Sequence, residues 1–278
     1  MVRNRRTQGK KGLDHAVQVL DRIFPFADYT DSLQSHRVVA EAVMRYLVEG
    51  SLLDVGSGAC AKAALLSLCG YRVSACDDLL DPWHLRNDNR KRIIEFARQV
   101  GIDFFLDRAG HAFPYQAGQF DLVLMSDILE HLHHSPLELL CQVLEWLKPG
   151  GFLLVTVPNA ANLRKRVSLL VGRTNYPPFE DFFWSPMPWR GHVREYVLHD
   201  LKLLSQFTQL DVVELRDIHK MAYGRLKSAL SRYLYYGATA VPIPGIRDSL
   251  LLVARKPQGW SRQHVSERRS SDTPVIRS

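Results

Sequence analysis

The sequence of 278 residues lacks any apolar run that approaches the roughly 18 residues of a membrane-spanning helix. Its basic N-terminus is not followed by the apolar stretch that a secretory signal requires. Cysteine is scarce as well: the four cysteines fall in predicted core segments without the spacing of metal ligands, which indicates reduced thiols. These absences predict a cytoplasmic protein.

The sequence also lacks a basic excess in its central part, although the net charge is +7. Residues 1–12 hold five basic and no acidic side chains, and residues 257–278 hold four basic and two acidic ones. Residues 13–256 are therefore neutral overall, which argues against a nucleic-acid partner. We expect a single domain over 13–256 between two disordered tails, 1–12 and 257–278.

Strand and helix patterns alternate along the first 160 residues. An apolar run at 51–58 ends in a glycine-rich turn and is expected to begin with a strand. Further strand candidates cover 71–78, 102–106, 120–125 and 151–159, and helical candidates cover 13–26, 35–48 and 61–68. A further helix is expected from Ser135, with Pro136 at its first position and Glu138 reaching back to cap it. This alternation predicts an α/β fold with a doubly wound, mostly parallel sheet.

The last third of the chain has a different composition. Residues 160–200 are rich in aromatic residues and proline, and strand candidates at 211–218 and 249–256 follow. A helix over 225–235 mixes basic and aromatic side chains, a pattern that fits a membrane surface but more often a helix packed on the sheet. We favour packing.

A glycine-rich turn follows the first strand, with Asp54 before it and Gly56 and Gly58 within it. Asp77 ends the next strand about 20 residues later, where a carboxylate suits the two hydroxyls of a ribose. Together with Ala61, the turn also matches a dinucleotide-binding pattern, so an NAD(P)-dependent oxidoreductase is an alternative. Asp54 argues against it, because a carboxylate there would repel a pyrophosphate.

An ordered series of motifs resembles the class I S-adenosylmethionine-dependent methyltransferases, in particular a branch with ubiquinone-pathway and natural-product O-methyltransferases. The motifs cover about residues 35–256 and are LLDVGSG, VSACD, FDLVLMSDILEHL, LKPGGFLLVTVPN and GHVREYVLHDLKLL. The resemblance implies a Rossmann-like, seven-stranded sheet whose last strand is antiparallel, and S-adenosylmethionine as the cofactor. It implies methyl transfer to a small-molecule, sugar or lipid-linked acceptor, with a hydroxyl as the expected nucleophile.

By the resemblance, the cofactor contacts Asp54, Gly56, Gly58 and Asp77, with Asp127 near its methionine end. Residues 160–200 leave the fifth strand at its carboxyl end and are expected to build the acceptor pocket; packing of their aromatic side chains as the core of a small cap is the alternative.

The chain departs from the family pattern at two places. Cys60 stands where the family has a third glycine, and Asp107 comes early for the family's adenine-contacting acid. These departures leave open a cofactor-binding scaffold without activity.

A catalytic group is expected from Glu130 and His131 after the fourth strand and from His192 in the acceptor segment. Asp127 shares their side of one helical turn. The group resembles the metal centre of small-RNA 3′-terminal 2′-O-methyltransferases, except that Asp127 replaces a glutamate and shortens the reach. In the metal-free interpretation, which we adopt, Glu130 and His131 brace the loop and His192 is the base.

Overall fold

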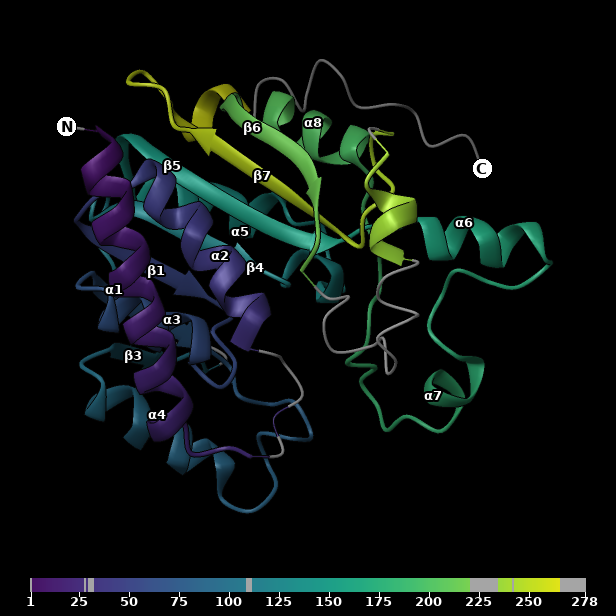
Figure 1. The fold of residues 1–278 in the computed structure, drawn as a ribbon, viewed down its shortest axis with the longest axis horizontal. Helices are drawn as coiled ribbons and strands as arrows, with labels where there is room; N and C mark the ends of the chain where they lie inside the picture. Colours follow the sequence, from purple (N-terminus) through teal and green to yellow (C-terminus); the bar gives the residue numbers. More distant parts are fainter. Residues whose placement is uncertain are drawn as a thin grey trace.

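A computed structural model describes residues 2–27, 29, 33–108, 112–220, 235–241 and 243–265, with the backbone alone for residues 2–11, 33 and 34 (Figure 1). Its centre is a seven-stranded sheet in the order β3-β2-β1-β4-β5-β7-β6. Strands β1 to β5 are parallel to one another, and β7 is antiparallel to both β5 and β6. The predicted fold class and the antiparallel last strand are confirmed. The strands are β1 Ser51–Val55, β2 Arg72–Asp77, β3 Asp103–Leu106, β4 Phe120–Ser126, β5 Leu147–Pro158, β6 Asp211–Ile218 and β7 Ser249–Arg255.

Helices cover both faces of the sheet and form a hydrophobic core on each side (Figure 1). One core includes α1 to α4, and the other includes α5 and α8. Successive residues of a strand point to opposite faces, so Leu52 belongs to the first core and Leu53 to the second. The helices are α1 Val2–Ile23, α2 Leu33–Tyr46, α3 Ala61–Leu68, α4 Asn89–Gln99, α5 Leu137–Trp146 and α8 Leu198–Phe207.

Helix α5 buries an apolar stripe. Its Leu140, Val143 and Leu144 are nearly inaccessible, as is Leu147 at the start of β5, and burial of each stabilises the fold by about 1.5–3 kcal/mol. The predicted cap is wrong, however. The helix begins at Leu137, and Glu138 pairs with Arg262 instead of reaching back over the first turn.

The two chain ends relate differently to the expected disordered tails. Helix α1 begins at Val2, so the backbone of residues 2–12 is helical rather than irregular. Residues 266–278 lie outside the described part of the chain, as does most of the helix expected at 225–235. No helix among the described residues is long and apolar enough to cross a membrane.

Residues 160–190 form an arm that projects beyond the sheet and carries α6 Leu163–Leu170 and α7 Phe179–Phe183 (Figure 1). Its aromatic side chains do not form the core of a cap. Phe182, Phe183 and Trp184 are mostly exposed, and only Trp189 is half-buried. The alternative that these aromatic side chains form the core of a small cap is therefore wrong for Phe182, Phe183 and Trp184.

Candidate functional site

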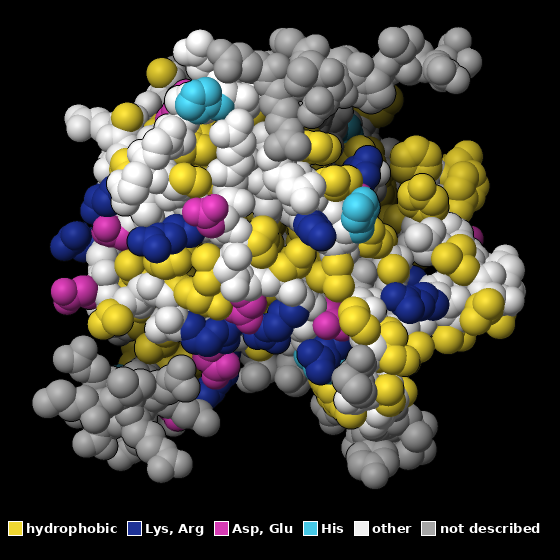
Figure 2. Space-filling view, turned by 90° about the horizontal axis from the view of Figure 1, so that it is seen from above, with side chains coloured by type: hydrophobic (Ala, Val, Ile, Leu, Met, Phe, Trp, Pro, Cys, Tyr) yellow, Lys and Arg dark blue, Asp and Glu magenta, His cyan; other side chains and the backbone are white. Residues whose placement is uncertain are grey.

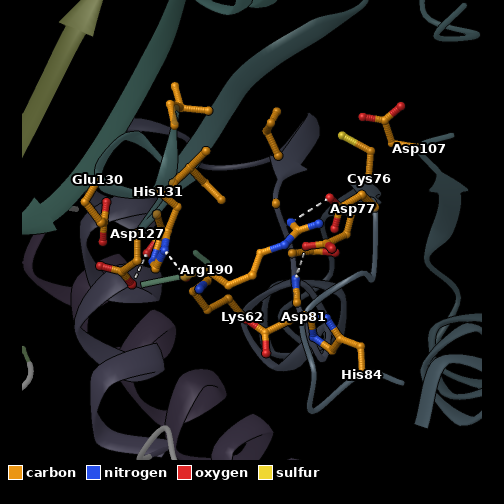
Figure 3. Close-up of a pocket in the computed structure, with 18 of the residues that line it drawn as sticks. Lys62, Cys76, Asp77, Asp81, His84, Asp107, Asp127, Glu130, His131 and Arg190 are labelled. Carbon is orange, nitrogen blue, oxygen red and sulfur yellow. Dashed lines mark hydrogen bonds and ion pairs between the residues drawn. The ribbon is translucent and has the colours of Figure 1, made fainter. Parts of the chain in front are cut away.

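The loops after β1, β2 and β4 border a cavity of about 810 Å³, called here the first cavity (Figure 3). Because parallel strands present their carboxyl ends at one edge of a sheet, residues distant in the sequence meet there. Of the residues predicted for the site, all but Asp54 line the first cavity: Gly56, Gly58, Asp77, Asp127, Glu130, His131 and His192.

The turn after β1 needs its glycines. Gly56 has φ +65°, and a Cβ there would lie 1.7 Å from the side chain of Ile128. Gly58 also has a positive φ, at +54°. Cys60, the departure from the family pattern, adopts φ +62° although it carries a side chain. The cysteine is buried and takes the backbone conformation that a glycine would supply, at a cost of about 1–2 kcal/mol, so the turn is preserved.

Asp77 ties the glycine turn to the end of β2. Its Oδ2 accepts a hydrogen bond from Gly58 N at 2.8 Å, and its Oδ1 accepts one from Leu79 N at 2.7 Å. Burial raises the pKa of this carboxyl despite these two donors. A carboxylate has about four lone-pair positions, so Asp77 can accept further hydrogen bonds on the cavity side.

Asp54 lies one layer behind the cavity wall. It shares the sheet face of Leu52 and is completely buried, and neither carboxylate oxygen has a hydrogen-bond partner among the described residues. Burial raises its pKa to about 7, against the opposing effect of Lys62. Asp54 is therefore less able to contact a cofactor directly than the sequence predicts.

Buried cations face Asp127 at the end of β4. The ammonium of Lys220 donates to Oδ2 of Asp127, and Ser126 Oγ donates to the same oxygen at 3.2 Å. Burial opposes ionisation of Asp127, but Lys220 and Lys62 outweigh it and hold its pKa below the ordinary value. Lys62 and Lys220 are both buried in the wall of the first cavity.

Glu130, His131 and His192 converge as predicted. One ligand atom from each lies within 4.8 Å of the others, and the two imidazole rings meet edge to face at 5.0 Å. Glu130 is fully buried without a hydrogen-bond partner among the described residues, and burial followed by repulsion from Asp127 raises its pKa to about 8. Asp127 is not part of this group, because its backbone is left-handed and its side chain pairs with Lys220.

Both histidines are held by their Nδ1 atoms. His131 Nδ1 lies 3.0 Å from the carbonyl oxygen of Arg190, and His192 Nδ1 lies 2.9 Å from Glu195 Oε1. The other carboxylate oxygen of Glu195 forms an ion pair with the buried Lys165. This fixes the orientation of each imidazole and directs its Nε2 away from the anchoring group.

A second cavity, of about 1350 Å³, lies between α6 and residues 173–181 of the arm. Aromatic and basic side chains line much of it, among them Tyr176, Phe179, Trp189, Arg164 and Arg173. His192 lines both the first and the second cavity. The Trp189 indole donates to the carbonyl oxygen of His192 at 3.3 Å, so it also steadies this position.

Arg190 crosses the first cavity from the arm toward the β2 side (Figure 3). Its guanidinium pairs with Asp78 at 3.1 Å. His133 Nε2 lies 2.7 Å from the carbonyl oxygen of Trp189, so the histidine side chains after β4 also hold the backbone of this segment. The arm is thereby fastened to both sides of the first cavity.

Comparison with known proteins agrees with this geometry. The family model described as "Methyltransferase domain" matches residues 31–215. The chain belongs to this methyltransferase family. S-adenosylmethionine is therefore its cofactor, and the alternative of an NAD(P)-dependent oxidoreductase is wrong. A search of the curated proteins found no match.

Solved structures share the fold of this methyltransferase. The 1,6-didemethyltoxoflavin-N1-methyltransferase of Burkholderia thailandensis, solved with S-adenosylhomocysteine, is 18% identical with a TM-score of 0.51, covering 80% of this chain and 78% of that one. A possible histamine N-methyltransferase of Thermotoga maritima is 17% identical with a TM-score of 0.51, covering 80% and 91%. The [4+2]-cyclase SpnF is 17% identical with a TM-score of 0.50, covering 80% and 82%.

The first cavity of the methyltransferase fits a cofactor without phosphate groups. Carboxylates of Asp77, Asp78, Asp81 and Asp107 line its β2 and β3 side and would repel a pyrophosphate. The opposite side offers Oδ1 of Asp127, which has no hydrogen-bond partner in the described part of the chain, and the buried cation of Lys62. These two groups are complementary to an ammonium and a carboxylate. A ribose at one end and an amino acid at the other match this distribution.

Several residues of the site escaped the sequence analysis. Lys62, Lys220 and Arg190 belong to no motif, and each reaches the site from a separate element or loop. Glu195 lies in the GHVREYVLHDLKLL motif, but no role in the site was predicted for it. A lysine in the first turn of an otherwise apolar helix, as in AKAALLSL, is the only one of these signals that the sequence displays.

Proposed function

We propose that the methyltransferase transfers a methyl group to a hydroxyl of a small-molecule acceptor bound in the second cavity, with His192 as the general base. The observation that carries this proposal is that His192 lines both cavities. A base that removes the acceptor's proton has to lie where acceptor and cofactor meet. The Burkholderia relative binds a small molecule, 1,6-didemethyltoxoflavin, which supports an acceptor of this size class.

We assign the two ends of the cofactor to opposite sides of the first cavity. Asp77 binds the ribose hydroxyls, Asp107 lies on the adenine side, and Gly56 and Gly58 let the backbone approach closely. Asp127 accepts a hydrogen bond from the ammonium at the methionine end of the cofactor, and Lys62 neutralises the cofactor's carboxylate at the same end. The role of Asp54 is indirect, through the strand end that it shares with the glycine turn.

The cofactor supplies a methyl group on a positively charged sulfur, and the chain's own residues prepare the nucleophile. We assign the proton of the neutral ring to Nδ1, which donates to Glu195, so that Nε2 is the basic nitrogen. Lys165 pairs with the other carboxylate oxygen of Glu195. The carboxylate then stabilises the imidazolium that forms when the acceptor hydroxyl loses its proton.

Glu130 and His131 complete the catalytic group beside His192. His131 is held by the Arg190 carbonyl, which links it to the segment that crosses the first cavity. These three residues could also hold a divalent ion, since histidine ligands in metal sites are commonly oriented through their second nitrogen. The proposed mechanism requires no ion, because His192 has its own orienting carboxylate.

The acceptor is expected to be apolar or planar and to carry a group that pairs with a cation. Tyr176, Phe179 and Trp189 offer aromatic surfaces, and Arg164 and Arg173 offer positive charge. A phenol, a sugar or a lipid-linked hydroxyl all satisfy the requirement for a nucleophilic oxygen.

The proposal is tested first by metabolite comparison of a strain with and without the gene, followed by transfer of labelled methyl from S-adenosylmethionine to the candidate acceptor. His192→Ala should lower turnover by about 100-fold or more and leave cofactor affinity unchanged. A wild-type protein that binds the cofactor and never transfers the label would instead indicate a cofactor-binding scaffold.

A further inference from the structure

The arm exposes an unusual amount of apolar surface. Met187 is 95% exposed, Leu170 is 85% exposed and Trp184 is 79% exposed. Tyr176, Phe179, Phe182 and Phe183 are also more than half exposed. Figure 2 shows hydrophobic side chains gathered at the end of the molecule that carries α6 and α7. Exposed apolar residues that occur singly are ordinary, but a group of this size on one segment marks an interaction surface.

Three exposed arginines accompany the apolar side chains on the same arm, against two exposed acidic residues, Glu180 and Asp181, in α7. Arg164, Arg166 and Arg173 are exposed, and no carboxylate pairs with them among the described residues. Within the described residues, Arg166 donates to the backbone carbonyls of Ala161 and Gly245. A surface of aromatic and aliphatic side chains bordered by arginines is complementary to an anionic membrane, where basic residues meet the headgroups and apolar ones enter the interface.

The shape of the arm also favours a bilayer over a second protein. Leu170 ends α6, whereas Trp184 and Met187 follow α7, so the most exposed apolar side chains stand on two separate projections. Projecting side chains can enter between lipid headgroups. A stable protein interface instead requires a continuous, closely complementary surface.

We propose that the arm docks on an anionic membrane surface through Leu170, Trp184 and Met187. Tyr176 and Phe179 are exposed on the arm and also line the second cavity. Docking therefore places that cavity at the bilayer surface. If the proposed function holds, this position favours the lipid-linked class among its acceptors.

The test is flotation of the full chain with vesicles of phosphatidylcholine and phosphatidylglycerol, compared with vesicles of phosphatidylcholine alone. We expect the protein to float with the anionic vesicles. The combined variant Leu170→Ser, Trp184→Ser and Met187→Ser should lower the bound fraction by about tenfold or more. Val48→Ser is the matched control: Val48 is 82% exposed, lies outside the arm and should not alter flotation.

Three outcomes would overturn the proposal: a wild-type protein that does not float, a combined variant that floats equally well, or a concentration-dependent dimer in light scattering that the combined variant loses. The last result would show that a second copy covers the arm. Calorimetric binding of S-adenosylhomocysteine checks that each variant is folded, because none of the substituted residues lines the first cavity. If the wild-type protein does not bind S-adenosylhomocysteine, the proposed function is contradicted. The flotation result still decides whether the arm docks on the membrane.

Discussion

His192 and Glu195 form a hydrogen-bonded pair at the boundary between the two cavities, with 2.9 Å between Nδ1 and Oε1. Glu195 is in turn paired with Lys165, so a charged chain runs from the base of α6 to the imidazole. The two residues lie three positions apart in a segment without helix or strand. The ion pair with Lys165, in a helix about 30 residues earlier, holds them in place.

Glu195→Gln should lower turnover by about tenfold to 100-fold, because the amide cannot stabilise the imidazolium of His192. We expect cofactor affinity to stay within about twofold of wild type. The acidic limb of the pH–rate profile should move to lower pH, since the carboxylate favours the protonated ring. Glu49→Gln, at an exposed position that lines neither cavity, is the control. An unchanged pH profile in Glu195→Gln would argue for a purely structural role.

Asp77→Asn should weaken binding of S-adenosylmethionine by about tenfold to 100-fold, as expected when hydrogen bonds to a charged acceptor are lost. Titration calorimetry measures this effect. Asp211→Asn, on an exposed position of β6, should bind like the wild type. Equal affinity in the two variants would remove Asp77 from the proposed cofactor contacts.

Asp54→Asn should stabilise the protein at alkaline pH. The folded state raises the pKa of Asp54 from its ordinary value of 3.8 to about 7, so stability from this group is complete below pH 3.8 and is lost as pH rises through 7. Each pKa unit corresponds to about 1.4 kcal/mol, so the gain is at most a few kcal/mol. Thermal melts at about pH 5 and about pH 8 should show a larger gain at the higher pH. A gain that does not vary with pH would mean that Asp54 is ionised in the folded protein throughout.

Methyl transfer should persist in excess EDTA, because His192 has a carboxylate partner and the proposed mechanism uses no divalent ion. Elemental analysis of the purified protein provides the companion measurement. Loss of activity that a divalent cation restores would instead assign a metal to Glu130, His131 and His192, the three groups whose ligand atoms converge.

Trp184→Ala and Trp189→Ala should differ in stability. Trp184 is mostly exposed, so its removal should change the free energy of unfolding by about 0.5 kcal/mol or less. Trp189 packs against Gly191 and Phe182 and donates to the His192 carbonyl, so its removal should lower Tm measurably. Equal losses of Tm would mean that the arm packs as a unit.

The sequence by itself determined the sheet and the cofactor turn. Strand and helix periodicities are local, and Gly56 and Gly58 are required by backbone conformation, so both are readable without knowledge of distant contacts. The resemblance of the turn with Glu130 and His131 to a known metal centre led to the prediction that His192 joins them, and their ligand atoms do converge. The order of the motifs along the chain predicted a methyltransferase, and the match to the family model confirmed it.

Only the tertiary structure decided how the charged groups pair. Asp127 and His131 are four residues apart and were expected on the same side of one helical turn. In the structure the Asp127 side chain instead pairs with Lys220, because a buried carboxylate is stabilised by a buried cation from the end of another strand. The burial of Asp54 behind the cavity wall and the anchoring of Glu195 by Lys165 depend on contacts between distant segments. The exposure of the arm could not be predicted from the sequence either, because aromatic composition is the same whether the side chains form a core or face the solvent.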